Sequence, residues 1–453
     1  MHGRRIATAT FPLGNDCGYG PGVARVLAID VGSSSARAQL FDERAEPVGE
    51  LMRAKYEGER DALRLVELVR KVAAEAGDAD AVGSSCFGHS LVGLGSDSRP
   101  VTPILDWRDV RSAAAAEHLL ARVDPDEVHR RTGCYVHPSY WPAKLAWLAE
   151  EGIVAERFVG FQELVPEREP AISLSQASAT GLLNLAAARW DEELLDVLGL
   201  DESRLPRIGD DPVDGWYPAL LDGVCSNVGA GCLGRDRAAL MIGTSGAFRT
   251  LYESDELAPR MGLFLYRVDA RRVLEGGALS DGGNLHGWLE DTLKPTQGNL
   301  AERPPDGHGL TFLTLLGGER SPGWSTRARG AIHGLTLSTT ALDLRQAAYE
   351  GVGYRFAEVA GLMPEVEEVV ATGGAVGDDE WVQILANVLE RPLTRSAVPE
   401  ASLRGAAVET LARLGEAAPP AAPLADVVQP CPERFEAHRA ARERQRRLYD
   451  AVT

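Results

Sequence analysis

The sequence predicts an α/β protein whose two lobes have similar folds and face each other across a cleft. A β-branched strand at 26–31 breaks at a Gly-Ser turn and returns as a second strand at 38–41. The same pattern recurs about half a chain later, where strands at 238–242 and 248–252 flank Gly243. Short strands alternate with helical stretches along the rest of the chain, which is typical of α/β folds. The repeated hairpin therefore predicts two similar lobes.

The other elements follow in chain order. Apolar residues at helical spacing predict helices at 60–76, 110–122, 340–362, 379–390 and 402–414. A strand and a turn are expected at 79–95, and a strand at 366–372 ends at Gly373 and Gly374.

Three regions are expected along the sequence. Residues 1–24 are rich in glycine and proline and lack an apolar period, so we expect a flexible leader. Residues 25–232 are assigned to an N-terminal lobe and residues 233–453 to a C-terminal lobe. A hinge is expected near the boundary between them.

The composition limits the partners. The 453 residues carry a formal net charge of −19 at pH 7, and such a surface repels nucleic acid and anionic membranes. The sequence has no apolar run of about 18 residues and no signal peptide. Its six cysteines show no metal-binding spacing. We therefore expect a cytoplasmic protein with a small-molecule substrate, and a homo-oligomer is left open.

Phosphate must be bound without a P-loop lysine. Only four of the 47 basic residues are lysines, and no G-x-x-x-x-G-K-[ST] string occurs. The two hairpin turns offer another route, because glycines let the backbone approach a phosphate while amides and small hydroxyls donate to its oxygens. Asp30 ends the first strand beside such a turn, where it could hold the Mg²⁺ that accompanies ATP, directly or through water.

These turns belong to a longer series of motifs. In chain order the strings are Ala28 to Arg37, Trp107 to Arg111, Ala177 to Leu183, Asp222-Gly223, Gly243 to Gly246, Gly317 to Pro322, Glu350 to Val352 and Thr372 to Gly374. With this order and spacing, residues 25–416 resemble the FGGY carbohydrate kinases. The resemblance implies a two-lobed actin-like, ribonuclease H-like ATPase fold with a central nucleotide cleft. It also implies ATP-dependent phosphorylation of a small sugar or sugar acid, with Mg²⁺.

The resemblance implies roles for individual residues. Asp222 matches the family's general base toward the attacking sugar hydroxyl. The residues expected to bind the ATP phosphates are Gly32, Ser33 and Ser34 of the first lobe and Gly243, Thr244, Ser245 and Gly246 of the second. Arg37 stands where the family has a basic residue and is either a phosphate ligand or a surface arginine.

Glycines are also expected at the adenosine end of the nucleotide. Gly318, Gly373 and Gly374 lack side chains that would keep the ring and ribose from the backbone. Five further residues that match family motifs are expected to be structural: Glu319, Arg320, Glu400, Arg404 and Gly405.

Sugar recognition is expected from the first lobe. The candidates are His89, Trp107, Asp109 and Arg111. This set leans basic, and a carboxylate substrate favours Arg or His, whereas neutral polyols need Asp, Asn or Gln partners and an aromatic face. The strings at 133–144 and 173–175 look most like the gluconate kinase branch. D-gluconate is therefore the leading substrate, with His89 and Arg111 as donors to its carboxylate.

Some positions depart from the family pattern. Leu221 precedes Asp222 where the family usually has glycine, and Ser173 stands where many members have aspartate. The stretch 149–172 is short and acidic, as if part of a helix and loop were missing. Two alternatives stay open: a kinase of another polyol or ketose, such as xylulose, glycerol or ribulose, and a non-catalytic actin-like ATP-binding protein.

Overall fold

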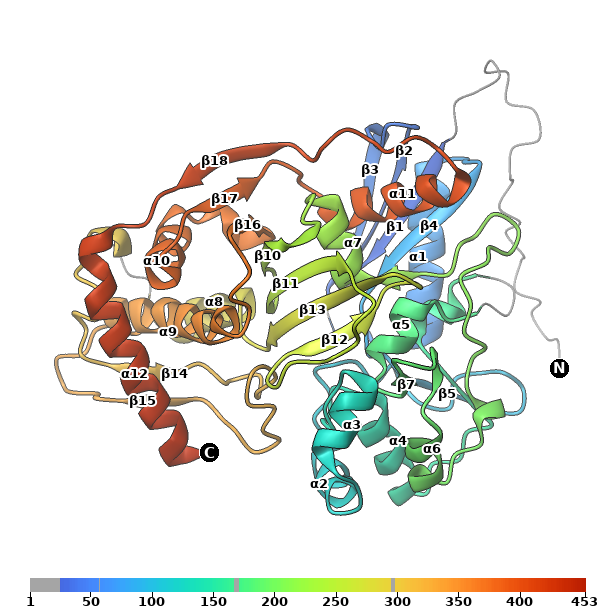
Figure 1. Cartoon of the computed structure of the whole chain (residues 1–453), viewed down its shortest axis with the longest axis horizontal. Coiled ribbons are helices and arrows are strands. Elements are labelled where there is room, and N and C mark those ends of the chain that lie inside the picture. Colours follow the sequence, from blue (N-terminus) through green and yellow to red (C-terminus); the bar gives the residue numbers. More distant parts are fainter. Residues whose placement is uncertain (1–24, 57, 167–170, 295–297) are drawn as a thin grey trace.

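Two mixed β-sheets form the framework of the molecule (Figure 1). The computed structural model describes residues 25–56, 58–166, 171–294 and 298–453, and the expected leader at 1–24 lies outside the described residues. The first sheet has the order β3-β2-β1-β4-β9. Its strands are β1 (Val26–Val31), β2 (Ser35–Phe41), β3 (Pro47–Lys55), β4 (Ala81–Cys86) and β9 (Leu220–Leu221).

The second sheet has the order β12-β13-β11-β10-β16-β17-β18. Its strands are β10 (Gly234–Ile242), β11 (Gly246–Glu253), β12 (Phe264–Arg267), β13 (Arg272–Leu279), β16 (Glu368–Thr372), β17 (Leu393–Ser396) and β18 (Leu424–Val428). Three short two-stranded sheets are β5 (Val92–Leu94) with β6 (Arg157–Val159), β7 (Leu183–Asn184) with β8 (Arg189–Trp190), and β14 (Thr311–Leu313) with β15 (Ala331–His333).

The two large sheets repeat one topology, as the paired hairpins predict. In the first, β1 is antiparallel to β2 and parallel to β4; in the second, β10 is antiparallel to β11 and parallel to β16. The sequence β3-β2-β1-β4-β9 thus corresponds strand for strand to β13-β11-β10-β16-β17. The two turns that contain Gly32 and Gly243 therefore occupy equivalent places in the two sheets.

Helices cover the sheets and fill the space beside them. Those of the first half are α1 (Ala62–Ala76), α2 (Ala113–Leu120), α3 (Pro125–Thr132), α4 (Trp141–Glu150), α5 (Leu174–Ala179), α6 (Glu192–Leu198) and α7 (Asp222–Gly229). Those of the second half are α8 (Gly283–Thr292), α9 (Ala341–Gly361), α10 (Asp379–Leu389), α11 (Ala401–Leu414) and α12 (Phe435–Val452). No helix among the described segments has the length and apolar character needed to cross a membrane.

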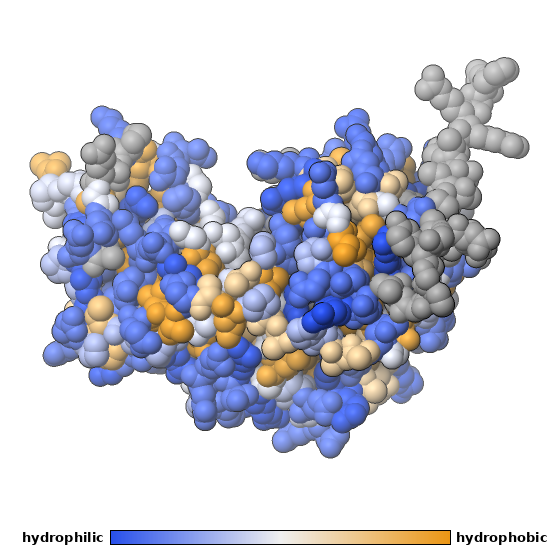
Figure 2. All heavy atoms as spheres, turned by 90° about the horizontal axis from the view of Figure 1, so that it is seen from above, coloured by the Kyte–Doolittle hydropathy of each residue, from blue (hydrophilic) through white to orange (hydrophobic). Residues whose placement is uncertain are grey.

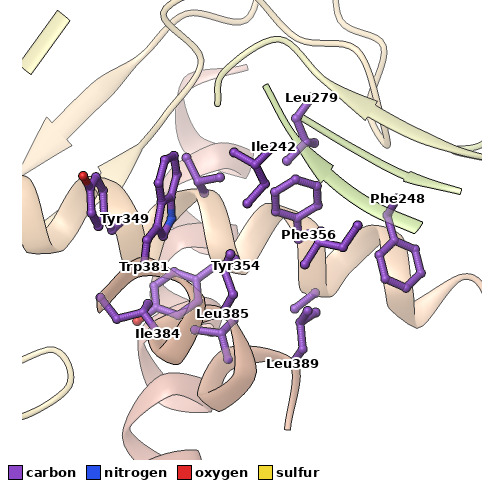
Figure 3. Packing of buried hydrophobic residues seen from close by; sticks show 14 of the residues in the cluster. Ile242, Phe248, Leu279, Tyr349, Tyr354, Phe356, Trp381, Ile384, Leu385 and Leu389 are labelled. Carbon is purple, nitrogen blue, oxygen red and sulfur yellow. The ribbon is translucent and has the colours of Figure 1, made fainter. Parts of the chain in front are cut away.

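The largest hydrophobic core lies against the second sheet (Figure 3). Phe248 of β11 and Ile242 of β10 pack against α9, where Phe356 and Tyr349 are buried. Trp381 of α10 stacks on Tyr349 with ring centroids 4.3 Å apart.

The helices begin where side chains can cap them: the Asp61 carboxylate accepts backbone N–H bonds at the start of α1, and Thr340 forms a capping box with Asp343 at α9.

Helix α11 crosses between the two halves of the sequence. It comes from the second half, but it packs on α7, β1 and β4 of the first sheet (Figure 1). A side chain on Gly229 would overlap the backbone of Ala401, and one on Gly405 would overlap the backbone of Cys225. The glycines let the helices approach closely, and Arg404 donates to the Gly229 carbonyl at 3.0 Å. Residues 401–414 of the expected C-terminal lobe therefore pack against the first sheet.

Candidate active site

Two adjoining cavities lie where the two hairpin turns face each other. The smaller, about 280 Å³, is lined by both turns together with Asp30, Trp107, Asp222 and Arg249. The larger, about 720 Å³, extends past α8 to Asp378 and Trp381. The residues that line both cavities are Ser33, Ser34, Gly243, Thr244 and Gly374. Figure 2 shows the surface hollowed between the two halves of the molecule.

The two turns are held in similar ways. The Gly32 N–H donates to the Ser35 carbonyl at 3.1 Å, and the Gly243 N–H donates to the Ser245 carbonyl at 3.0 Å. The second turn is also fixed from α8, because the Gly283 N–H donates to the Gly243 carbonyl at 2.7 Å. Each turn thus presents small hydroxyls and backbone to the smaller cavity, as a phosphate site requires.

Glycine is required where the backbone strands meet the cavity. Gly373 has a φ of 92°, and a side chain there would come within 2.5 Å of the Ile242 carbonyl oxygen. A side chain on Gly246 would lie 2.6 Å from the Phe356 ring. Gly374 lines both cavities, as expected for a residue near the nucleotide. Gly318 instead lies outside both, in a turn where its N–H donates to the Leu315 carbonyl.

Asp30 lies at the floor of the smaller cavity and is only 2% exposed. One carboxylate oxygen accepts from the Ser85 hydroxyl at 2.7 Å, and the other pairs with Arg37 at 2.7 Å. Arg37 also pairs with Glu400 at 2.7 Å, so it links β2 to the start of α11. Burial raises the pKa of Asp30, although Arg37 and Ser85 act against this. Arg37 is therefore neither a surface arginine nor a free cation.

The donors around the smaller cavity fit a magnesium-bound nucleotide. Asp30 lines it, and a carboxylate oxygen suits Mg²⁺, which keeps several of its waters. The Thr372 hydroxyl and the Arg249 Nε are buried without a partner among the described groups, and both residues face this cavity. No cluster of three potential metal-ligating side chains occurs in the described part of the chain, so nucleotide and water would supply the other ligands.

Asp222 begins α7 at the wall of the smaller cavity. Its Oδ1 accepts the Gly223 N–H at 2.7 Å. Burial raises its pKa, the charge of Arg249 lowers it, and the charge of Asp30 raises it further. A carboxylate with a raised pKa beside a phosphate site is suited to accept a proton from a hydroxyl.

Arg249 is a cavity residue that we did not expect from the sequence. It is 6% exposed on β11, and its Nη2 donates to the Ser226 hydroxyl of α7 at 2.8 Å. A side chain on Gly223 would lie 2.6 Å from its Nη1, so the guanidinium lies directly over the residue after Asp222. In the described structure no carboxylate lies within 4 Å of Arg249. Its position on a strand gave no signal, since only folding brings β11 to α7.

His89 lies outside both cavities, two residues after the cavity-lining Phe87 and among aromatic rings. Its ring lies edge-on to the Tyr140 ring, with ring centroids 5.0 Å apart. The Tyr140 and Tyr266 hydroxyls form a hydrogen bond of 2.7 Å. Burial lowers the pKa of His89 to about 3, so the ring is neutral. Its Nδ1 lies 2.5 Å from the Ala179 carbonyl oxygen and must be the protonated nitrogen. His89 therefore offers Nε2 as an acceptor for a hydroxyl, not a donor for a carboxylate.

Lys144 holds the His89 loop in place. It is 1% exposed, and its ammonium donates to the carbonyls of His89 at 2.5 Å, Ser139 at 2.9 Å and Leu105 at 3.1 Å. Burial lowers its pKa to about 7. The His89 backbone has a φ of 65°, which is uncommon for a residue with a side chain, and these bonds help to maintain it.

The residues of the Trp107–Arg111 motif do not all lie at the cavity. Trp107 lines the smaller cavity, and the Arg320 guanidinium lies 4.5 Å from its ring centre. Asp109 and Arg111 lie outside both cavities and pair with each other at 2.5 Å. The Arg111 side chain is 48% exposed and also lies over the Trp147 ring. Asp109 and Arg111 thus fix the segment that presents Trp107, and neither lines the site.

Arg320 was expected to be structural, and its guanidinium also lies over the Trp107 ring. It is 7% exposed, and its Nη2 donates to the Leu279 carbonyl at 2.6 Å. Its charge acts on Asp222, His89 and His137, so it faces the end of the site beyond Trp107. Glu319, by contrast, is a buried structural residue, because its carboxylate pairs with Arg355 and accepts from Tyr449.

The two departures from the family pattern are compensated locally. A side chain on Gly88 would overlap the Leu221 Cδ1, so the absence of one at Gly88 makes room for Leu221. Ser173 caps α5 and donates to the Ala219 carbonyl at 2.7 Å. The neighbouring Ser175 hydroxyl accepts the Leu221 N–H at 3.1 Å. These bonds fix the strand that leads into Asp222.

Comparison with known proteins places this geometry in a family. The model of the N-terminal domain of the FGGY family of carbohydrate kinases matches residues 25–210, and that of its C-terminal domain matches residues 238–412. The chain belongs to the FGGY family of carbohydrate kinases. A gluconokinase of Bacillus subtilis (strain 168) is 27% identical over 450 residues, covering 86% of this chain and 88% of the relative.

Two solved structures of FGGY kinases resemble the whole molecule. The gluconate kinase from Lactobacillus acidophilus has a TM-score of 0.82 at 25% identity and covers 95% of this chain and 98% of its own. The ligand-bound xylulose kinase from the same species has a TM-score of 0.82 at 25% identity, with coverages of 94% and 98%. The fold is the two-lobed actin-like ATPase fold of these kinases, and the protein is a sugar kinase.

Proposed function

We propose that the protein transfers the γ-phosphoryl group of ATP to D-gluconate and forms 6-phosphogluconate. The observation that carries the choice of substrate is the positive charge at the sugar end of the site. Arg320 is buried beyond Trp107 with no carboxylate within 4 Å in the described structure, and the Lys144 ammonium lies behind His89. A neutral polyol would leave these cations uncompensated, whereas a carboxylate would pair with one of them. The gluconokinase relatives support the same choice.

The residues of the cleft would share the work of phosphoryl transfer. The phosphates would lie between Ser33 and Thr244, with the adenosine in the larger cavity beside Trp381. The sugar would extend from Asp222 past Trp107 toward His89. Asp222 would accept the proton of the attacking hydroxyl, and most of the rate gain would come from positioning and charge neutralisation.

Magnesium would be held near Asp30, through water, because Arg37 already occupies one carboxylate oxygen. When bound, the ion would neutralise charge on the phosphates. Asp30 itself would orient the ion's waters, and Ser85 would hold the carboxylate in place.

D-xylulose is the second candidate substrate. The xylulose kinase structure is as similar to this chain as the gluconate kinase structure. The neutral His89 and the paired tyrosines Tyr140 and Tyr266 also suit hydroxyl groups. None of these three residues requires a carboxylate.

A matched pair of substrates tests the role of charge. D-gluconate and D-glucitol differ at C1, where a carboxylate replaces a hydroxymethyl group. A hydrogen bond to a charged group contributes about 1.5–3 kcal/mol, so kcat/KM for gluconate should exceed that for glucitol by about tenfold to 10²-fold. The product should carry phosphate at C6. Equal values for the pair, or a preference for D-xylulose over both, would reject the sugar-acid assignment.

A further inference from the structure

We propose that Arg249 is a catalytic residue that binds the transferring phosphoryl group, and this inference rests on the proposed phosphoryl transfer. Arg249 is the cavity arginine whose charge is both buried and unpaired. Arg37 lines the same cavity, but Asp30 and Glu400 both pair with it. Arg53 also lines the cavity, but it is exposed on β3.

The position of Arg249 is fixed by the element that carries Asp222. The Ser226 hydroxyl accepts from Nη2, and the Asn227 amide donates to the Arg249 carbonyl at 3.2 Å. Both partners belong to α7, whose first residue is Asp222. The guanidinium and the carboxylate are therefore held as one rigid unit, which spans β11 of the second sheet and α7.

This location selects the phosphoryl group over the sugar carboxylate. The reacting hydroxyl must lie within hydrogen-bond distance of Asp222, and the γ-phosphorus must approach that hydroxyl. A cation directly over Gly223 is therefore near the reacting oxygen. In gluconate, the carboxylate at C1 and the reacting hydroxyl at C6 lie at opposite ends of the carbon chain. The carboxylate would be nearer to Arg320 and Trp107.

The chemistry needs a cation at this point. The hydroxyl oxygen forms a bond to the γ-phosphorus while the bond from that phosphorus to the β,γ-bridging oxygen breaks, and ADP leaves with the electron pair. The hydroxyl proton goes to Asp222. Charge is spread over the equatorial oxygens of the transferring group, where preorganised N–H donors are most effective. The Arg249 Nε is buried without a partner in the described structure, so a donor is available.

Arg249→Met and Arg249→Lys test the proposal. Removal of one preorganised donor typically costs about 10²–10³-fold in kcat. We expect Arg249→Met to lose kcat in this range for both gluconate and a neutral acceptor, with KM values within about threefold of the wild type. Arg249→Lys should retain part of the activity, because it keeps the charge but not the planar donors. Arg53→Met removes a charge from the exposed mouth of the same cavity and should lower kcat far less.

Two readouts separate a catalytic role from a structural one. The first is the binding of ADP with aluminium fluoride, an analogue of the transferring group. Fluoride and aluminium should tighten ADP binding by the wild type, and Arg249→Met should lose this gain while its affinity for ADP alone is kept. The second is the acid limb of the pH profile, which should move to higher pH because the cation that favours ionised Asp222 is gone.

The other groups that act on Asp222 stay in place in this variant. They are Asp30 on β1, the Gly223 N–H on α7 and Arg320 after β14. Cys86 on β4, Cys225 on α7 and Tyr266 on β12 also face Asp222, whose charge raises their pKa values. A loss confined to KM for gluconate would overturn the proposal and make Arg249 a carboxylate ligand. An unchanged kcat, or a variant that still responds to aluminium fluoride, would also overturn it. A wild type without sugar-dependent ADP release would instead refute the proposed function itself.

Discussion

Asp222 combines burial with a place at the wall of the phosphate cavity. Replacing it with asparagine keeps an oxygen that can accept the Gly223 N–H, so the local fold should be retained. Loss of a general base typically costs about 10²–10⁴-fold in rate. We therefore expect Asp222→Asn to lower kcat for gluconate by at least about 10²-fold, with ATP affinity within a few fold. Titration with ATP and a coupled assay measure both, and near-normal turnover would remove Asp222 from the mechanism.

The pH profile should report the same carboxylate. A general base acts in its ionised form, and burial raises the pKa of Asp222. Activity should therefore fall as the pH falls through this raised pKa, with a midpoint above the ordinary aspartate value of about 4. The measurement is kcat/KM against pH for the wild type and Asp222→Asn. An acid limb at the ordinary value, or one that persists in the variant, would contradict the assignment.

Arg111 should not discriminate between substrates. Its side chain pairs with Asp109 and is half exposed, and Arg60 also reaches Asp109 at 3.4 Å. We expect Arg111→Ala to lower kcat/KM for gluconate and glucitol by the same factor, less than about fivefold, since exposed ion pairs contribute little. A loss selective for gluconate would mean that Arg111 reaches the carboxylate after all.

The sequence predicted residues that share a local motif better than residues that meet through the fold. Both hairpin turns, Asp30 and Asp222 were predicted because each is embedded in a recognisable string, and the structure brings them to one cavity, where their roles stay predictions. Arg249 could not be found in this way, because β11 and α7 come together only in the folded chain. Asp109 and Arg111 were misplaced because adjacency to Trp107 in sequence does not fix which side chains turn toward the cavity.

At the scale of elements, the packing of α7 against α11 connects Asp222, the proposed general base, to the rest of the molecule. Gly405 faces the Cys225 backbone with no space for a side chain. Gly405→Ala should force the helices apart and destabilise the protein by about 1–3 kcal/mol, the usual cost of overpacking. Because α7 begins with Asp222, kcat should fall as well.

Thermal or urea unfolding checks this prediction, with Gly361→Ala as the matched control. Gly361 is also helical, and a side chain there meets nothing within 4 Å. The control should be neutral or slightly stabilising, because alanine favours helix more than glycine does. Equal free energies of unfolding for the two variants would show that α7 and α11 can move apart without loss of stability.

Most elements were predictable because their periodicity is local. The predicted helices at 60–76, 340–362, 379–390 and 402–414 match α1, α9, α10 and α11 within two residues at each end. The predicted helix at 110–122 begins only at Ala113, because the preceding residues form the turn that Asp109 and Arg111 stabilise. The packing of α11 on the first sheet was not predictable, because the sequence of a helix does not indicate which strands or helices it packs against.

At the scale of the whole molecule, the repeated hairpin did predict the repeated sheet. Two sheets of equivalent strand order place the Gly32 and Gly243 turns opposite each other, and both turns line the smaller cavity. The net charge of −19 gives an anionic sugar or nucleotide no attraction at long range. Binding of an anionic sugar or nucleotide must therefore depend on the few buried cations of the site. The net charge of the protein does not reveal these cations.

Phosphoryl transfer is tested most directly by ADP release from the purified protein with Mg·ATP, measured without sugar and then with gluconate, xylulose, glycerol, ribulose, fuculose and rhamnulose. We expect slow release without sugar, a large stimulation by one sugar class with gluconate foremost, and one phosphorylated sugar formed per ADP. Release that is the same with and without every sugar would contradict the central claim that the cleft transfers phosphate from a nucleotide to a sugar hydroxyl.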